Sequence, residues 1–304
     1  MIKKYSFGIG DRFAHQGKYQ LQAFVEAQQL GLDISPVWNK SYREHKTVHS
    51  LHRSVRVEAD QAVQALDWKE PYFVDADHIT INTVDPFIPY SDFFTIDIAE
   101  QINSPLSLQE KSEFLKKYQE YIGLLKVPGL SLELIITTDE LLGIADKFYK
   151  ATQTASCVYN TIKKQKASEY FVVEVSLDEV DTPQSPIELF FILRMLADQG
   201  VPVNTIAPKF SGNFYLGLDY EGEIGLFKKE FEDDLMVIKY AIKEFGLPKD
   251  LKLSIHTGSD KYSLYPIINQ LIKKHDAGLH VKTAGTTWLE ELIWACLGNS
   301  YEFF

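Results

Sequence analysis

The sequence predicts an α/β protein, a (β/α)8 barrel of the TIM type formed by a single domain, residues 1–304. Short apolar segments alternate with segments of helical periodicity, and this order is typical of a parallel sheet covered by helices. Eight such units can be recognised, which favours a closed barrel over an open sheet. The chain length of 304 residues also suits one barrel of this type.

The eight predicted strands are the apolar segments. Each one leads into polar, loop-like residues, and most of the connections between them are long enough for a crossover helix. The strands are predicted at residues 5–9, 32–38, 72–76, 93–98, 170–175, 203–207, 251–255 and 279–281.

Helices are predicted between these strands from their periodicity and their end signals. Gly31 and Gly200 mark the ends of two of them, and Ser107 followed by Glu110 is the start signal of another. The predicted helices lie at 18–30, 57–68 and 186–199, and a final helix starts near Thr287.

The competing fold is a doubly wound sheet, which needs a glycine fingerprint after its first strand. Gly8 and Gly10 supply two glycines, but Phe13 stands where the third is expected. An acidic residue at the end of the next strand is also missing. The barrel is therefore the favoured prediction.

Two connections are longer than a barrel requires, and we predict insertions there. The segment 122–167 includes the break at Pro128 and Gly129, and we expect two or three extra helices in it. The segment 210–225 is rich in glycine and aromatic residues and follows the end of a strand. We expect this second segment to overhang the site as a lid or binding loop, since long loops often have that role.

Composition excludes some partners. The formal net charge of −11 argues against nucleic acid and anionic membranes, which both attract a basic surface, but a local cation cluster can still bind a small anion.

Cys157 and Cys296 fit no metal-ligand spacing and are expected to be reduced thiols. No signal sequence and no apolar run of about 18 residues is found, so we expect a cytoplasmic protein. The oligomeric state is not indicated.

Nearly every predicted strand end carries a polar residue able to bind a substrate or a metal. In a (β/α)8 barrel the active site lies where the strands end, and buried charges are costly unless they are paired or bound to metal. The residues concerned are Asp11, Arg12, Asn39, Lys40, Arg43, Asp75, Asp77, His78, Asp97, Glu174, Lys209, His256, Asp260, Lys261, His280 and Lys282.

Histidines and a carboxylate in this set indicate a metal site. We expect His78, His256, His280 and Glu174 to bind one divalent ion, with Zn, Mn, Fe, Ni and Co all compatible. The alternative for the histidines is an ordinary hydrogen-bonded role. For Glu174, which lies inside an apolar strand, the alternative is a buried salt bridge to a lysine such as Lys209.

A separate group, His45, His49 and His52, follows the second predicted strand. Their spacing could place them on one helix face. We interpret them as surface or substrate-loop residues, with metal binding as the alternative.

The cations Lys40, Arg43, Lys209 and Lys282 come from three predicted strands and suggest that the substrate carries an anionic group. Lys209 or Lys282 could instead form a Schiff base, as in aldolases. The set of expected substrate-binding residues is Asp11, Arg12, Asn39, Lys40, Arg43, Lys209, Asp260, Lys261 and Lys282.

At these residues the sequence resembles the tagaturonate epimerases of bacterial hexuronate catabolism. The matching stretches are FGIGDRF at 7–13, PVWNKS at 36–41, DADHI at 75–79, FFTID at 93–97, HTGSDK at 256–261 and HVKTAGT at 280–286. The resemblance implies interconversion of D-tagaturonate and D-fructuronate by inversion at C3, assisted by a divalent metal. Members of the family are longer, so it also implies a shortened or truncated member.

Inversion beside a ketone requires two acid/base groups on opposite faces of the substrate. We expect Asp77 and Glu174 to fill these roles, with the substrate carboxylate at Lys40, Arg43 or Lys282. Two other functions remain open at this point. One is a keto-acid aldolase that uses a metal or a Schiff base, and the other is a non-catalytic protein that binds sugar acids.

Overall fold

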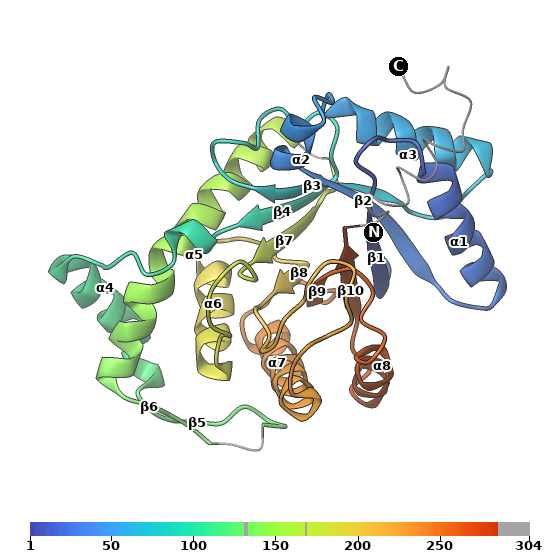
Figure 1. Ribbon diagram of the computed structural model, residues 1–304. Coiled ribbons are helices and arrows are strands. Elements are labelled where there is room, and N and C mark those ends of the chain that lie inside the picture. The colour runs from blue at the N-terminus through green and yellow to red at the C-terminus, as the bar shows by residue number, and fades with distance from the viewer. Residues whose placement is uncertain (131–132, 168, 285–304) are drawn as a thin grey trace.

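Eight parallel strands form a closed barrel in the computed structural model, which describes residues 1–130, 133–167 and 169–284 (Figure 1). Each predicted strand overlaps one of them, so the barrel is confirmed and the doubly wound sheet is excluded. The order around the barrel is β1 (Tyr5–Gly10), β10 (Leu279–Thr283), β9 (Lys252–Gly258), β8 (Thr205–Ala207), β7 (Val172–Ser176), β4 (Phe93–Asp97), β3 (Phe73–Ile79) and β2 (Ile34–Ser41).

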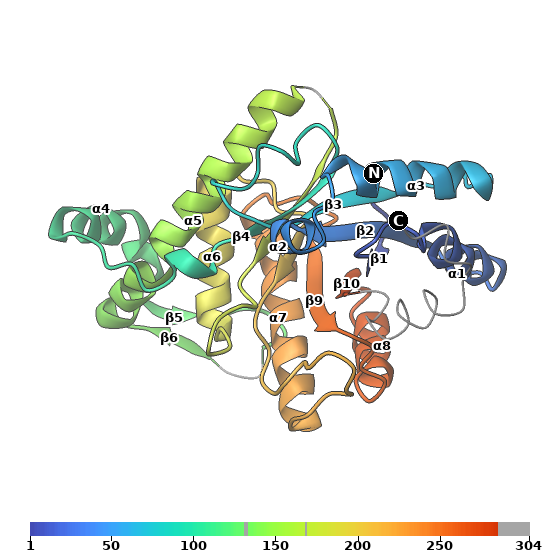
Figure 2. The same cartoon turned by 45° about the horizontal axis from the view of Figure 1, so that its top comes forward.

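Helices surround this barrel, with the largest apolar core between them and the strands (Figures 1 and 2). They are α1 (Gly17–Gln29), α2 (Tyr42–Thr47), α3 (Arg53–Ala65), α4 (Leu108–Tyr118), α5 (Thr138–Lys166), α6 (Pro186–Asp198), α7 (Ile224–Glu244) and α8 (Tyr265–Lys274), with short 3-10 turns at Ala99–Gln101 and Gln119–Tyr121. Ser107 and Glu110 form the expected capping box at the start of α4. The helix predicted near Thr287 lies outside the described residues.

The first predicted insertion differs from expectation. It holds an antiparallel hairpin, β5 (Gly123–Leu125) and β6 (Leu134–Ile136), followed by the single helix α5 of 29 residues, so the prediction of two or three helices is wrong. A capping box of Thr137 and Glu140 starts α5, and no proline follows to interrupt it. Gly143 does not break α5, because the packing of α5 against α6 stabilises the helix beyond its local propensity.

No helix in the described part of the chain is both long and apolar enough to cross a lipid bilayer. Cys157 is an exposed free thiol on α5. Cys296 lies outside the described residues.

Candidate functional site

The carboxyl ends of the barrel strands open into a cavity of about 860 Å³. The loop between β8 and α7 forms part of its wall through Phe210, Phe214, Tyr215 and Leu216, so this loop does overhang the cavity as expected. The predicted site residues that line the cavity are Arg12, Asn39, Arg43, Asp77, His78, Asp97, Lys209, His256 and Lys282.

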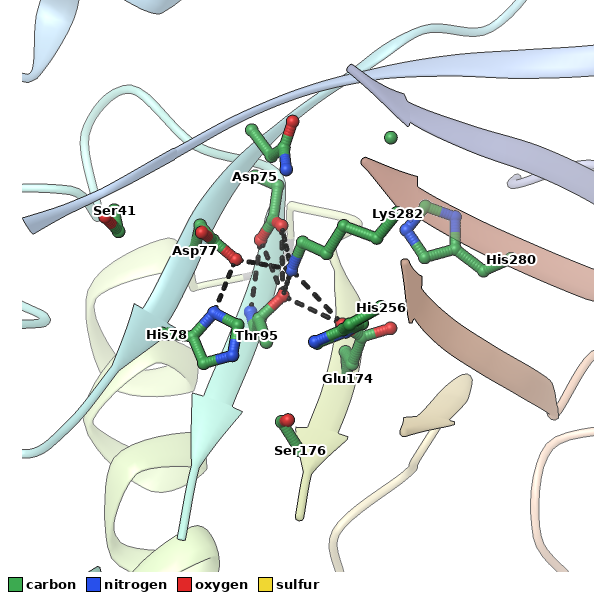
Figure 3. A network of polar contacts seen from close by, with 12 residues as sticks. Ser41, Asp75, Asp77, His78, Thr95, Glu174, Ser176, His256, His280 and Lys282 are labelled. Atoms are coloured by element: carbon green, nitrogen blue, oxygen red, sulfur yellow. Dashed lines mark hydrogen bonds and ion pairs between the residues drawn. The ribbon is translucent and has the colours of Figure 1, made fainter. Parts of the chain in front are cut away.

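Lys282 lies at the centre of a buried polar network at the floor of this cavity (Figure 3). Its Nζ atom is 2.7 Å from Oδ2 of Asp75, 2.6 Å from Oδ1 of Asp77 and 3.3 Å from Oε1 of Glu174. It also donates a hydrogen bond of 2.5 Å to Oγ1 of Thr95. Burial alone would lower the pKa of Lys282, but the three carboxylates hold it well above its ordinary value. The ammonium is therefore charged and fully engaged.

The three carboxylates around Lys282 differ in proton affinity. Burial raises the pKa of Asp75 to about 7, since the charges of Asp77 and Glu174 add to burial and Lys282 offsets only part of it. For Asp77 burial acts in the same direction, yet Lys282 and His78 hold its pKa below the ordinary value. The network thus keeps Asp77 ionised beside a carboxyl group that can retain a proton.

His78 owes its position to an irregular backbone. Consecutive side chains of a regular strand point to opposite faces, so Asp77 and His78 should diverge. The register of β3 against β4 shifts between Ala76 and Ile79, and His78 adopts a left-handed φ of 48°. Such a conformation is strained for a residue with a side chain and is often found at functional sites. Here it turns both side chains toward the cavity, with Nδ1 of His78 2.8 Å from Oδ1 of Asp77.

Within the described residues, His78, Asp178 and His256 form the group best suited to hold a metal ion. One ligand atom from each lies within 4.8 Å of the other two. Nε2 of His78 is 3.4 Å from Oδ1 of Asp178, and Nδ1 of His256 is 3.0 Å from Oδ2. This Nδ1 atom is buried, and its contact with Asp178 does not have hydrogen-bond geometry, as expected where the two atoms share a ligand. Two imidazoles and one carboxylate are a common ligand set for divalent transition metals.

The remaining nitrogen of each imidazole contacts a carboxylate of the Lys282 network. Nε2 of His256 lies 2.9 Å from Oε1 of Glu174, and Nδ1 of His78 lies 2.8 Å from Oδ1 of Asp77. Carboxylates behind metal-binding histidines fix the orientation of the rings and increase their basicity. Burial opposes a positive charge on His256, but Asp178 and Glu174 raise its pKa to about 9. The geometry therefore fits a divalent cation held by His78, Asp178 and His256.

Asp178 was not among the residues expected at this site. It lies two residues beyond the end of β7, so the predicted strand did not include it. A signal was present, because Glu174, Ser176 and Asp178 are spaced by two residues and can share one face of an extended chain.

His280, an expected metal ligand, is not part of this group. It lies two residues before Lys282 on β10, deeper in the barrel, where its Nδ1 atom is 2.9 Å from Oγ of Ser6. Its ring packs against Phe93 at a centroid distance of 5.1 Å. Burial lowers its pKa to about 3, so the ring is neutral.

Glu174 also lies deeper than expected, because it is fully buried and does not line the cavity. Its buried ion pair is with Lys282 rather than with Lys209.

Four expected substrate-binding residues are not among those that line the cavity in the described part of the chain. Asp11 accepts hydrogen bonds from the backbone N–H groups of residues 13–16. Lys40 is buried and donates to the carbonyl of Arg12. Asp260 accepts a hydrogen bond from the Tyr265 hydroxyl, and Lys261 donates to backbone carbonyls. All four residues therefore have contacts that stabilise the loops around the mouth of the cavity.

The group at residues 45–52 also differs from its interpretation as surface or substrate-loop histidines. His45 is buried, and its Nδ1 atom lies 2.9 Å from Oγ of Ser50. Its ring is 4.6 Å from that of His52, and both rings pack against Phe87. Burial lowers the pKa of His45 to about 3. These two histidines therefore act as aromatic packing beneath α2, while His49 is exposed.

Fold and cavity together define a (β/α)8-barrel protein with polar groups gathered at the carboxyl ends of its strands, the place where enzymes of this fold have their active sites. The family model of UxaE, tagaturonate epimerase, matches residues 1–295. This chain therefore belongs to the tagaturonate epimerase family, which confirms the resemblance seen in the sequence.

Relatives of known name agree with this assignment. A tagaturonate/fructuronate epimerase from Thermotoga maritima is 29% identical over 299 residues, which cover 94% of this chain and 58% of the relative. A glycerol-complexed crystal structure of the fructuronate-tagaturonate epimerase UxaE from Cohnella laeviribosi has a TM-score of 0.80 at 26% identity, covering 97% of this chain and 60% of that one. The chain thus spans about three fifths of the length of these relatives. The YdjI aldolase from Escherichia coli, with a TM-score of 0.50 at 8% identity, shares the fold alone.

Proposed function

We propose that this chain interconverts tagaturonate and fructuronate by inversion at C3, with a divalent metal held by His78, Asp178 and His256. The observation that carries the proposal is the placement of these three ligands at the barrel mouth, each imidazole backed by a carboxylate. Family membership supports the reaction, and the named relatives act on the same pair of sugar acids by their titles.

A divalent ion bound at the mouth would supply Lewis acidity to a carbonyl oxygen of the substrate. The protein's own residues must then remove and return the proton at C3. Asp77 suits this role, because it lines the cavity and the Lys282 ammonium keeps it ionised. Glu174 is fully buried behind His256, so we assign it a positioning role through that ring instead of direct contact with the substrate.

Inversion also needs a proton donor on the other face of the substrate, since one base that returned its own proton would restore the starting configuration. Asp97 at the end of β4 and Lys209 after β8 both line the cavity and can exchange protons. Burial raises the pKa of Asp97, which favours its protonated form. Substitution of each in turn identifies the second group.

The substrate carboxylate requires a cation that is not already committed. Lys282 is bound to three carboxylates, and Lys40 is buried against the carbonyl of Arg12. Arg43 is exposed on α2 and lines the cavity, so it is the strongest candidate of the three expected cations. Its guanidinium can bind a carboxylate through two parallel hydrogen bonds.

The ion pairs of Lys282 with three carboxylates keep its ammonium charged. Lys282 is therefore unsuitable as a Schiff-base nucleophile, because that chemistry needs a neutral amine. Lys209 remains the residue that an aldolase mechanism would use. Reduction with borohydride in the presence of substrate would trap such an adduct and label the chain.

The direct test is conversion of D-tagaturonate by the purified chain, before and after chelation and after metal is restored. Conversion in D2O should place deuterium at C3 of the product, because the proton is exchanged with acid/base groups open to solvent. Epimerised product without deuterium, or activity that survives complete metal removal, would contradict the proposal.

A further inference from the structure

The loop between β8 and α7 crosses the mouth of the cavity, and its backbone is bound to the loop that follows β9. Phe214, Tyr215 and Leu216 line the cavity. Phe214 also packs against the apolar core, but Tyr215, Leu216 and Leu218 are 50%, 63% and 53% exposed, so apolar burial holds the tip of this loop only weakly. Hydrogen bonds also hold this tip, among them those that Asp219 accepts from the backbone N–H and the hydroxyl of Ser263.

Lys261 supplies such contacts. Its side chain is fully buried, and its Nζ atom donates to the carbonyls of Tyr215 at 3.0 Å and Leu218 at 2.9 Å. The same atom is 3.0 Å from the carbonyl of Ser259 and 2.9 Å from its hydroxyl. A buried ammonium needs several acceptors to replace its hydration, and here the loop backbone provides them. Burial lowers the pKa of Lys261.

Two neighbours of Lys261 add to this attachment. Oγ of Ser259 accepts a hydrogen bond of 2.9 Å from the N–H of Gly217. Gly258 has a left-handed φ of 68°, and a Cβ atom there would lie 3.2 Å from both Leu216 Cδ2 and the carbonyl of Phe214. The loop therefore lies directly on the backbone of the β9–α8 connection.

We propose that Lys261 is a positioning residue that holds residues 213–219 across the mouth of the cavity, with Ser259 as its partner. Neither residue lines the cavity, so any effect on the reaction acts through the loop. The effect on turnover rests on the proposed epimerase function, while the effect on the loop does not.

The test replaces Lys261 with Met, which keeps the length of the side chain and removes every donor. Chymotrypsin cleaves after exposed Tyr and Leu, so cleavage at Tyr215, Leu216 and Leu218, mapped by mass spectrometry, reports release of the loop. We expect cleavage there to accelerate roughly tenfold or more, in line with the loss of hydrogen bonds to a charged group. Lys273→Met, at an exposed lysine on α8, is the matched control and should cleave at the wild-type rate.

A second substitution covers the case in which Lys261→Met does not fold. Ser259→Ala removes one acceptor and the contact to Gly217, and it should accelerate cleavage in the same loop by a few-fold. Circular dichroism and thermal melting check that each variant is folded, and cleavage confined to 213–219 separates loop release from global unfolding. Unchanged cleavage of the loop in the folded variants would overturn the proposal.

The kinetic prediction has its own readout. Because the loop forms part of the cavity wall, Lys261→Met should raise KM for the uronate several-fold with a smaller change in kcat. If no chain in the series, including wild type, converts the uronate, the proposed function fails while the cleavage result still decides the role of Lys261. A folded Lys261→Met variant with accelerated loop cleavage but wild-type KM and kcat would overturn the effect on turnover.

Discussion

The imidazole of His78 contacts the carboxylate of Asp77, although the two residues are consecutive in one strand. The left-handed φ of 48° at His78 and the register shift beside it make this contact possible. A strand without this irregularity would point His78 away from the cavity. The local backbone of β3 thus decides whether the barrel mouth has two imidazoles or one.

The metal site gives the first prediction. His78→Ala, His256→Ala and Asp178→Asn should each lower metal content sharply while the fold is retained, since each removes or weakens one of three ligands. His275→Ala is the matched control, because its imidazole contacts Glu232 on the outer surface. Metal is measured by mass spectrometry after dialysis. Retention of full metal content in all three variants would rule out this ligand set.

The second prediction concerns Glu174, whose carboxylate contacts the proposed metal ligand His256. Glu174→Gln keeps the size of the side chain but weakens its contact with His256 and removes one charge from Lys282. Loss of such a partner typically weakens metal binding about 10–100-fold. Titration with a competing chelator measures the change, and an unaltered dissociation constant would remove Glu174 from the support of the site.

Lys282 gives a prediction on stability. Lys282→Met removes the ammonium from the buried carboxylates of Asp75 and Glu174 and the largely buried one of Asp77, so their repulsion and desolvation are no longer offset. Breaking a buried ion pair in this way typically costs about 3–5 kcal/mol of the free energy of unfolding. Urea denaturation is the measurement, with Lys273→Met expected within about 0.5 kcal/mol of wild type. A similarly small effect for Lys282→Met would mean that the carboxylates are neutral in the folded protein.

Glu58 on α3 sets a pH dependence away from the metal site. Burial and the nearby charge of Asp11 raise its pKa to about 9, from 4.5 in the unfolded chain, although Gly17 and Lys40 act in the opposite direction. The folded state therefore holds a proton that the unfolded state releases. Its contribution to stability is complete below about pH 4.5 and is lost as the pH rises through about 9.

Glu58→Gln isolates this contribution, because the amide resembles the protonated acid. Between pH 5 and 9, the stability of wild type relative to the variant should fall by at most about 1.4 kcal/mol per pH unit. Urea unfolding at several pH values measures the difference. A difference that is constant across this range would show that Glu58 is ionised in the folded protein.

Arg43 is expected to set the affinity for the substrate. Arg43→Met should raise KM about tenfold or more with kcat largely kept, because a carboxylate remote from the reacting carbon is bound equally in the ground and transition states. Lys46→Met, on the same short helix but not among the cavity-lining residues, is the control. An unchanged KM for Arg43→Met would transfer the role to Arg12 or Lys209.

Periodicity was sufficient to predict the barrel, since each strand is a separate apolar segment followed by polar residues. The hairpin β5–β6 was missed because strands of three residues leave almost no pattern. The site was predicted only in part, because depth and direction depend on backbone detail. His280 and Lys282 share a face of β10, but two residues of strand separate them by about 6.6 Å, enough to remove His280 from the mouth.

Side-chain direction explains the remaining differences. Asn39 and Lys40 are neighbours in β2, so only one of them can face into the barrel, and Asn39 is the one that lines the cavity. Asp178 was missed because it lies two residues beyond the end of β7, although its spacing from Glu174 and Ser176 places it on the same face of an extended chain. Lys261 was expected to bind the substrate, but two of its acceptors are backbone carbonyls of a loop more than forty residues away in sequence.

The position of Lys282 on β10 has a consequence for how the chain folds. Closure of the barrel pairs Tyr5 with Leu279, a contact between the beginning and the far end of the described chain, and such distant contacts form slowly. Asp75, Asp77 and Glu174 belong to strands that can assemble earlier, and they repel one another until β10 is in place. The last barrel strand along the described chain thus carries the counterion of the whole cluster, and a folding intermediate that lacks it should be most stable in acid, where those carboxyl groups are protonated.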